Sequence, residues 1–167
     1  FAYLIAIGYC KTSSFYKYIC RLLIFALVSQ IPFSLVFSER IKIHSFFDFF
    51  IFIFGRPYLH LNIFFTLAIG LIAIRVWDIV KSLLFKTMTI LGLGIIAEIF
   101  NTDYGLYGVA IILAFYIFID SKVKIVISQV IVYLVFSALQ ILLYVYEIQG
   151  KAINISWFIQ MLSLLSL

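Results

Sequence analysis

The amino-acid sequence predicts an all-α protein, a polytopic bundle of transmembrane helices with about six to seven spans or part-spans. Of its 167 residues, 66% are hydrophobic and 11% are charged, whereas a soluble domain is roughly half apolar and one quarter charged. Residues 125–146 contain no charge, and about 20 helical residues cross a bilayer core. Runs such as Leu22–Val28 are apolar at every position, unlike the alternating strands of a membrane barrel. Because a backbone in lipid must satisfy its own hydrogen bonds, these segments are expected to be helices.

The apolar segments and the breaks between them give the expected order of elements. Pro32 is expected to kink the second helix, and the aromatic stretch 46–54 is too short to cross, so it is expected to lie at the interface or re-enter. The segments form one integral membrane domain over 1–167. Its end runs are shorter than a span, so the domain is expected to be truncated at both ends. The expected helices cover residues 1–9, 17–37, 60–80, 83–100, 104–120, 124–146 and 152–167.

Positive charge gathers in alternate loops of this topology. Because cytoplasmic loops carry an excess of Lys and Arg, the richer set is predicted to face the cytoplasm. The charges form no continuous basic face, so nucleic acid is not an expected partner. Cys10 and Cys20 lack metal-ligand spacing, and no metal site is expected. The richer set comprises Lys11, Lys17, Arg21, Arg75, Lys81, Lys86, Lys122 and Lys124, against Arg40, Lys42, Arg56 and Lys151 in the other loops.

Polar side chains inside the apolar segments are candidates either for packing or for a polar cavity. Asn62 and Thr66 lie one helical turn apart and are open to both interpretations. A second set forms a stripe on one face of the helix expected over 124–146, and it would either bond to neighbouring helices or line a path. This stripe consists of Gln129, Tyr133, Gln140 and Tyr144.

Several charged or titratable residues invite specific pairings. Arg75 and Asp78 are three residues apart and are expected to pair as a structural anchor. Glu98 and Asp103 lie close in sequence, and paired carboxylates can divide acid and base roles. The two histidines, His44 and His60, have no partner at ligand spacing and are interpreted as loop or interface residues.

The densest polar and glycine motif is Asn101-Thr102-Asp103-Tyr104-Gly105-Leu106-Tyr107-Gly108. Asn, Asp and Gly favour turns. The motif therefore predicts a tight hairpin between two helices, or the same turn lining a site with Asp103 aimed into the bundle.

Three stretches in order resemble the TraX family, whose name comes from an F-pilin acetylation protein. They are residues 1–33, residues 61–70, beginning Leu61-Asn62-Ile63-Phe64-Phe65-Thr66-Leu67, and residues 101–108 with the core Asp-Tyr-Gly-x-Tyr-Gly. The family also looks related to a broader group of multi-span membrane acyltransferases. The positions that match its motifs are Gly8, Tyr9, Arg21, Gln30, Pro32, Asn62, Asp103, Tyr104, Gly105 and Gly108. At position 7 the family often has an acid, whereas this chain has Ile7.

The resemblance implies a multi-pass protein of the bacterial cytoplasmic (inner) membrane that acetylates a peptide, pilin-like or glycan acceptor using acetyl-coenzyme A. Family members carry further spans with His residues that would lie outside 1–167, so this stretch alone is not expected to be active. The alternatives are a small transporter or channel, whose path the polar stripe would line, and a non-catalytic membrane assembly partner.

Acetyl transfer needs a base, donors for the developing oxyanion and a grip on the anionic cofactor. The hypothesis from the sequence assigns each part to residues of this chain. Asp103 is the candidate base. Lys11, Lys17 and Arg21 are expected to bind the coenzyme A phosphates. The expected hydrogen-bond donors are Gln30, Asn62 and Tyr104. The expected structural residues are Gly8, Tyr9, Pro32, Gly105 and Gly108.

Overall fold

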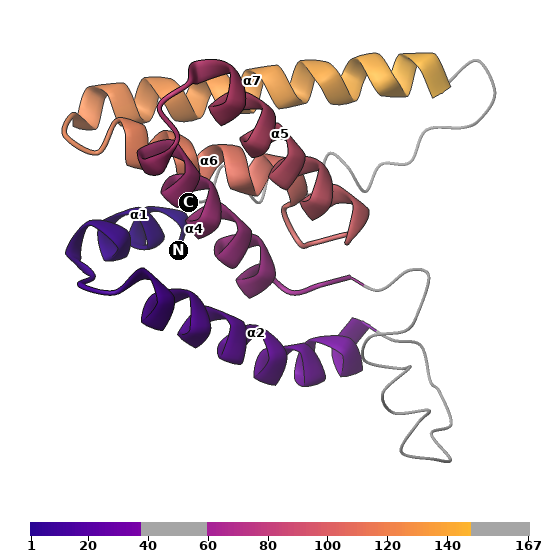
Figure 1. Ribbon diagram of the computed structural model, residues 1–167. Helices are drawn as coiled ribbons and strands as arrows, with labels where there is room; N and C mark the ends of the chain where they lie inside the picture. Colours follow the sequence, from indigo (N-terminus) through magenta and orange to yellow (C-terminus); the bar gives the residue numbers. More distant parts are fainter. Residues whose placement is uncertain (38–59, 148–167) are drawn as a thin grey trace. The chain divides into compact units, whose positions relative to one another are not determined.

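The computed structural model describes residues 1–37 and 60–147, and within these ranges every regular element is a helix. An isolated bridge between Leu61 and Thr102 accompanies the helices. The chain divides into two compact units, residues 1–132 and residues 133–167, and the packing described below belongs to the first. The expected helix over 152–167, the aromatic stretch 46–54 and His44 lie outside the described residues. Figure 1 shows the helices α1 (Ala2–Lys11), α2 (Phe15–Phe37), α4 (Ile63–Ile79), α5 (Leu83–Ile99), α6 (Gly105–Ile117) and α7 (Lys122–Glu147).

The helices follow the predicted order, with differences at their ends. Helix α1 continues past the expected end at residue 9 through Cys10 and Lys11, so the connection to α2 has only three residues. Helix α2 continues through Pro32 to Phe37. Helix α4 begins only at Ile63, because residues 60–62 are extended and bond to another segment.

Two described helices are long and apolar enough to cross a membrane, judged by length and composition. They are α2, over Phe15–Ser34, and α7, over Lys122–Leu143. Helices α1 and α6 are apolar but shorter, with 10 and 13 residues. The expected number of six to seven spans therefore stays a prediction.

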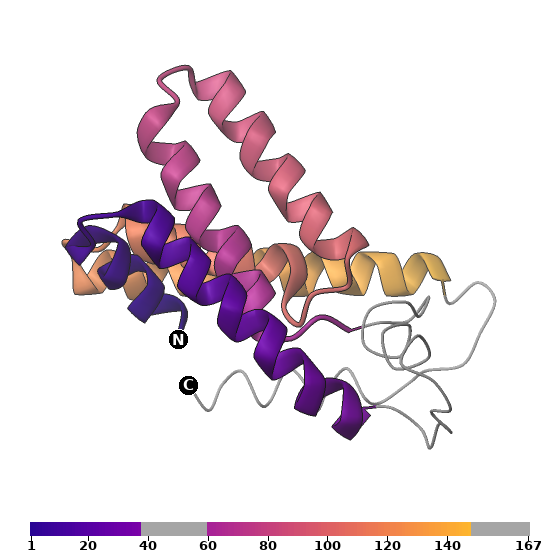
Figure 2. The same cartoon turned by 60° about the horizontal axis from the view of Figure 1, so that its bottom comes forward.

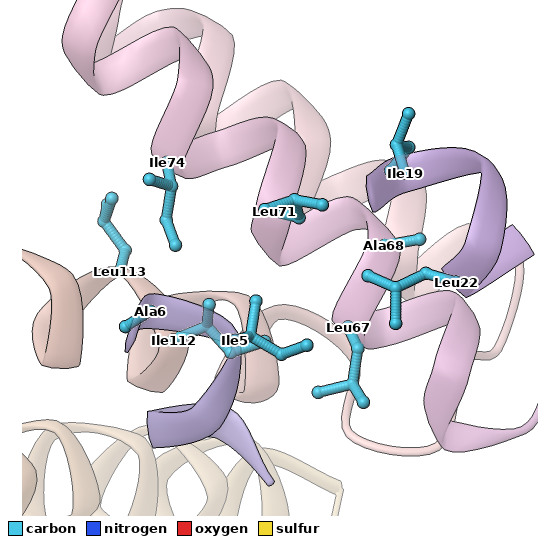
Figure 3. Packing of buried hydrophobic residues seen from close by; sticks show 10 residues of the cluster. All are labelled: Ile5, Ala6, Ile19, Leu22, Leu67, Ala68, Leu71, Ile74, Ile112 and Leu113. Atoms are coloured by element: carbon cyan, nitrogen blue, oxygen red, sulfur yellow. The ribbon is translucent and has the colours of Figure 1, made fainter. Parts of the chain in front are cut away.

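The core lies where α6 contacts α1, α4 and α5, while α4 also contacts α2. Leu71 and Ile74 of α4 and Ile112 of α6 are almost completely buried at its centre. Figure 3 shows these side chains with their neighbours from α1 and α2. A smaller cluster of Ala73, Ala97 and Val109 joins α4, α5 and α6.

Large apolar side chains also cover the outside of the helices. Helix α5 exposes Leu84, Met88, Leu91 and Ile95, and Figure 2 shows it beside α4, running antiparallel to it. A helix that is apolar on its packed face and on its outer face is typical of a lipid environment.

Gly108 allows α6 to approach α4. A Cβ at this position would lie 2.5 Å from the Thr66 Cγ2 and 2.7 Å from the Tyr104 Cβ, and both atoms are held close to the backbone. Gly92 of α5 has no atom within 4 Å of the equivalent position. A methyl group added at Gly108 would therefore collide with neighbouring atoms, whereas the same group at Gly92 would not, so the two alanine variants can be compared directly.

We expect Gly108→Ala to destabilise the fold by about 1–3 kcal/mol, because overpacking at a close helix contact forces the backbones apart. Gly92→Ala should be neutral or stabilising by up to about 1 kcal/mol, because alanine favours a helix. Thermal unfolding of the two variants in the same detergent checks this. Equal melting temperatures would contradict the close contact.

Candidate functional site

The end of α1 and the start of α2 enclose a basic pocket. Its volume is about 320 Å³. Three of its side chains are cations, and none is an acid, so the pocket favours an anion. We call it the basic pocket; it is lined by Gly8, Lys11, Thr12, Ser13, Ser14, Lys17, Tyr18 and Arg21.

Local chain geometry builds the basic pocket. Helix α1 ends where Thr12 turns to an extended conformation, and its Oγ1 donates to the Ser14 carbonyl over 3.4 Å. The Ser14 Oγ accepts from the Lys17 N–H over 3.5 Å, a long contact at the position where serine favours a helix start. Lys17 and Arg21 are four residues apart and therefore share one face of α2. The first N–H groups of α2 add partial positive charge.

A cluster around Asp78 ties three helices together beside the basic pocket. The Asp78 Oδ2 accepts from the Tyr9 hydroxyl and its Oδ1 from the Tyr116 hydroxyl, each over 2.7 Å. The two rings meet edge to face with centroids 5.4 Å apart. We call Tyr9, Asp78 and Tyr116 the tyrosine clamp; it joins the ends of α1, α4 and α6.

Arg75 extends the tyrosine clamp to α2. Its Nη1 donates to the Tyr9 hydroxyl over 3.4 Å, and its guanidinium lies 5.5 Å from the centroid of the Phe15 ring. Arg75 and Asp78 were predicted to pair with each other; the hydroxyl of Tyr9 joins them instead. Phe15 directly follows Ser14, which lines the basic pocket. Through Arg75, the tyrosine clamp therefore holds the chain next to this pocket.

Two buried amides connect α2 to the start of α4. The Gln30 Oε1 accepts from the Asn62 backbone N–H over 3.0 Å and from the Asn62 Nδ2 over 2.9 Å. The Gln30 Nε2 donates to the Ser34 Oγ and to the His60 carbonyl. The Asn62 Nδ2 also donates to the Ala26 carbonyl over 2.8 Å, and its Oδ1 caps α4 by accepting from the Phe64 N–H. Gln30 is 0% and Asn62 3% exposed.

This arrangement changes the role expected for Gln30 and Asn62. An amide carries two N–H donors, and both donors of each residue are already bonded within the fold. They hold helices together and have no N–H left for an oxyanion. The Asn62 amide bonds to α2, while the buried Thr66 Oγ1 has no partner in the described part of the chain.

The motif 101–108 forms the tight hairpin that its residue types predict. Asn101 and Gly105 have positive φ angles of 48° and 46°, which Asn and Gly adopt more readily than other residues. The Glu98 Oε1 accepts from the Leu106 N–H over 2.7 Å, so this carboxylate caps the start of α6. Glu98 therefore has a local role in the turn, separate from Asp103.

The same hairpin holds the segment before α4. The Leu61 N–H donates to the Asn101 carbonyl over 3.0 Å, and the Asp103 N–H donates to the Leu61 carbonyl over 2.9 Å. The Thr102 Oγ1 is buried without a partner among the described residues. Residues 60–62 and 101–103 thus form one polar junction, which Gln30 joins from α2.

Asp103 and His60 both belong to this polar junction, each bonded to it through its own contact. Burial raises the pKa of the half-buried Asp103 carboxyl, and the nearby positive charge of His60 opposes the rise. The His60 ring is exposed, and its Nδ1 lies 3.0 Å from the Asn101 carbonyl. Sequence reasoning treated His60 as an isolated loop residue; its place two residues before the Asn62 motif was the available indication. Tyr104, the N-cap of α6, is 40% exposed nearby.

The residues proposed for one site thus fall into two groups. Lys11, Lys17 and Arg21 come together in the basic pocket, whereas Gln30, Asn62, Asp103 and Tyr104 belong to or adjoin the polar junction. Arg21 and Gln30 are nine residues apart, which is about 14 Å along α2.

Two members of the polar stripe of α7, Gln129 and Gln140, differ in their surroundings. The Gln129 Nε2 is buried without a partner in the described ranges, and Gln140 is exposed. Over the same ranges, no group of three or more His, Cys, Asp and Glu could hold a metal ion.

Over residues 1–37 and 60–147, the fold and the basic pocket define an all-helical protein with apolar outer faces, two candidate membrane spans and a site suited to an anion. The model of the family described as TraX protein matches residues 1–166, so the chain belongs to the TraX family. Comparisons with curated proteins and with solved structures give no significant match.

We expect Tyr116→Phe to lower stability by about 1 kcal/mol, because it removes a hydrogen bond to a charged carboxylate that joins α6 to α4. Tyr16→Phe is the control, because the Tyr16 side chain is 78% exposed. Melting temperatures in detergent check the difference. Equal losses in the two variants would contradict a structural role for the tyrosine clamp.

Proposed function

We propose that this chain is part of a membrane-embedded acyltransferase that moves an acetyl group from acetyl-coenzyme A to a peptide, pilin-like or glycan acceptor. Membership of the TraX family supports the reaction class. The observation that carries the proposal is the basic pocket, because three cations around a 320 Å³ hollow match a polyanionic cofactor.

The residues of the basic pocket fit the coenzyme A phosphates. Lys11, Lys17 and Arg21 supply positive charge, and Arg and Lys are the side chains best suited to phosphate. Backbone N–H groups at the start of α2 and the hydroxyls of Ser13 and Ser14 add hydrogen-bond donors. When bound, the cofactor supplies an activated acetyl thioester.

The proposal includes a multi-pass topology in the bacterial inner membrane, with the basic pocket facing the cytoplasm. Support comes from the tyrosine clamp, which gathers the ends of α1, α4 and α6 and with them the Lys- and Arg-rich loops. An excess of cations at one end of a helical bundle is typical of its cytoplasmic side. Acetyl-coenzyme A would then enter from the compartment that contains it.

The polar junction is the proposed place for acid–base chemistry. Asp103 is the carboxylate there, and the exposed Tyr104 remains a candidate donor. Gln30 and Asn62 support the junction as fixed structure, because their donors are bonded within the fold.

Arg21→Ala should weaken acetyl-coenzyme A binding by about tenfold or more, because a charge-assisted hydrogen bond contributes about 1.5–3 kcal/mol. Lys124→Ala is the control, since Lys124 is an exposed cation that does not line the basic pocket. Isothermal titration of the full chain in nanodiscs measures both. Unchanged affinity in Arg21→Ala would remove Arg21 from the site.

Labelled acetyl-coenzyme A then tests the reaction class. Acetylated product from purified full-length protein and an acceptor extract supports the acetyltransferase. Solute flux through reconstituted vesicles without acetylated product would favour the transporter instead.

A further inference from the structure

The polar junction contains an imidazole whose proton position follows from its contact. The His60 Nδ1 lies 3.0 Å from the Asn101 carbonyl oxygen. A carbonyl oxygen only accepts hydrogen bonds, so the nitrogen facing it must carry the hydrogen. In the neutral ring the other nitrogen, Nε2, then holds the basic lone pair.

The ring is accessible while its surroundings are held in place. The His60 side chain is exposed, its carbonyl accepts from the buried Gln30 Nε2 over 3.0 Å, and its Nδ1 is bound to the hairpin. The N–H and the carbonyl of the next residue, Leu61, both form hydrogen bonds with the hairpin. A base fixed in orientation and reachable from outside is what acid–base catalysis requires.

Asp103 supplies a complementary charge. Its N–H bonds to the carbonyl of Leu61, the residue after His60, and a positive charge on His60 lowers the pKa of its half-buried carboxyl. A carboxylate near an imidazole stabilises the imidazolium that forms when the ring takes up a proton.

We propose that His60 is the catalytic base that activates the acetyl acceptor, with Asp103 stabilising the protonated ring. This inference rests on the proposed acetyltransferase function. The acceptor's N–H or O–H proton moves to Nε2 while its nitrogen or oxygen bonds to the acetyl carbonyl carbon. The carbon–sulfur bond breaks, sulfur leaves as thiolate, and the proton on Nε2 neutralises it.

The proton position is tested without any activity. The sequence contains two histidines, so His44→Gln leaves His60 as its one imidazole. Nitrogen-15 spectra of this variant, labelled at histidine, distinguish hydrogen on Nδ1 from hydrogen on Nε2. We expect it on Nδ1; a neutral ring with hydrogen on Nε2 would overturn the proposal.

The catalytic role is tested with His60→Asn in the full chain. An asparagine side-chain N–H reaches the position of Nδ1, so the bond to the Asn101 carbonyl can persist while Nε2 is lost. We expect acetyl transfer to fall about 100-fold or more, the usual contribution of a general base. Acetyl-coenzyme A affinity and melting temperature should stay close to wild type, since the basic pocket lies elsewhere.

The outcomes separate the two proposals. Wild-type transfer rates in His60→Asn would overturn the role of His60 and leave the acetyltransferase standing. A full-length wild-type protein, with the further spans of the family, that transfers no acetyl group to any amine or hydroxyl acceptor would overturn both. If His60→Asn both loses transfer and unfolds, Asp103→Asn is measured instead, because it keeps the shape of the junction. Unchanged transfer in Asp103→Asn would overturn the role given to Asp103.

Discussion

The contact between Gln30 and Asn62 is the constraint on which the described structure depends. Each of these amides has its oxygen accepting and both of its N–H groups donating, and both lie buried between apolar helices. A buried polar group without a partner costs about 1–3 kcal/mol. Water is scarce in such surroundings, so the buried polar groups of α2 and of the start of α4 form hydrogen bonds with each other.

This contact positions the start of α4 and the segment before it. It caps α4 and holds the His60 carbonyl, and it therefore presents Leu61 to the hairpin that carries Asp103. At the far end of α4, the tyrosine clamp and Arg75 secure α1 and the first residue of α2. Helix α4 is thus tied to α2 at both ends, and each tie lies next to one of the two candidate functional regions.

Sequence reasoning succeeded where the relevant physics is local. Apolar runs predicted the helices, and Lys11, Lys17 and Arg21 converge because they flank a single short turn. It failed where residues distant in the chain meet. Gln30 and Asn62 are 32 residues apart and Tyr9 and Asp78 are 69 apart, and composition cannot tell a packing amide from a catalytic one. His60 looked isolated because its partner is a backbone carbonyl 41 residues away, which leaves no trace in side-chain patterns.

A double-mutant cycle on Gln30→Ala and Asn62→Ala tests the central claim most directly. Stability of the wild type, both single variants and the double variant is measured by denaturant unfolding in one detergent. Residues in direct contact show interaction energies of about 0.5–3 kcal/mol, and the network described here predicts a value of about 1 kcal/mol or more. Losses that add within about 0.3–0.5 kcal/mol would mean that the two amides act independently, which would contradict the account.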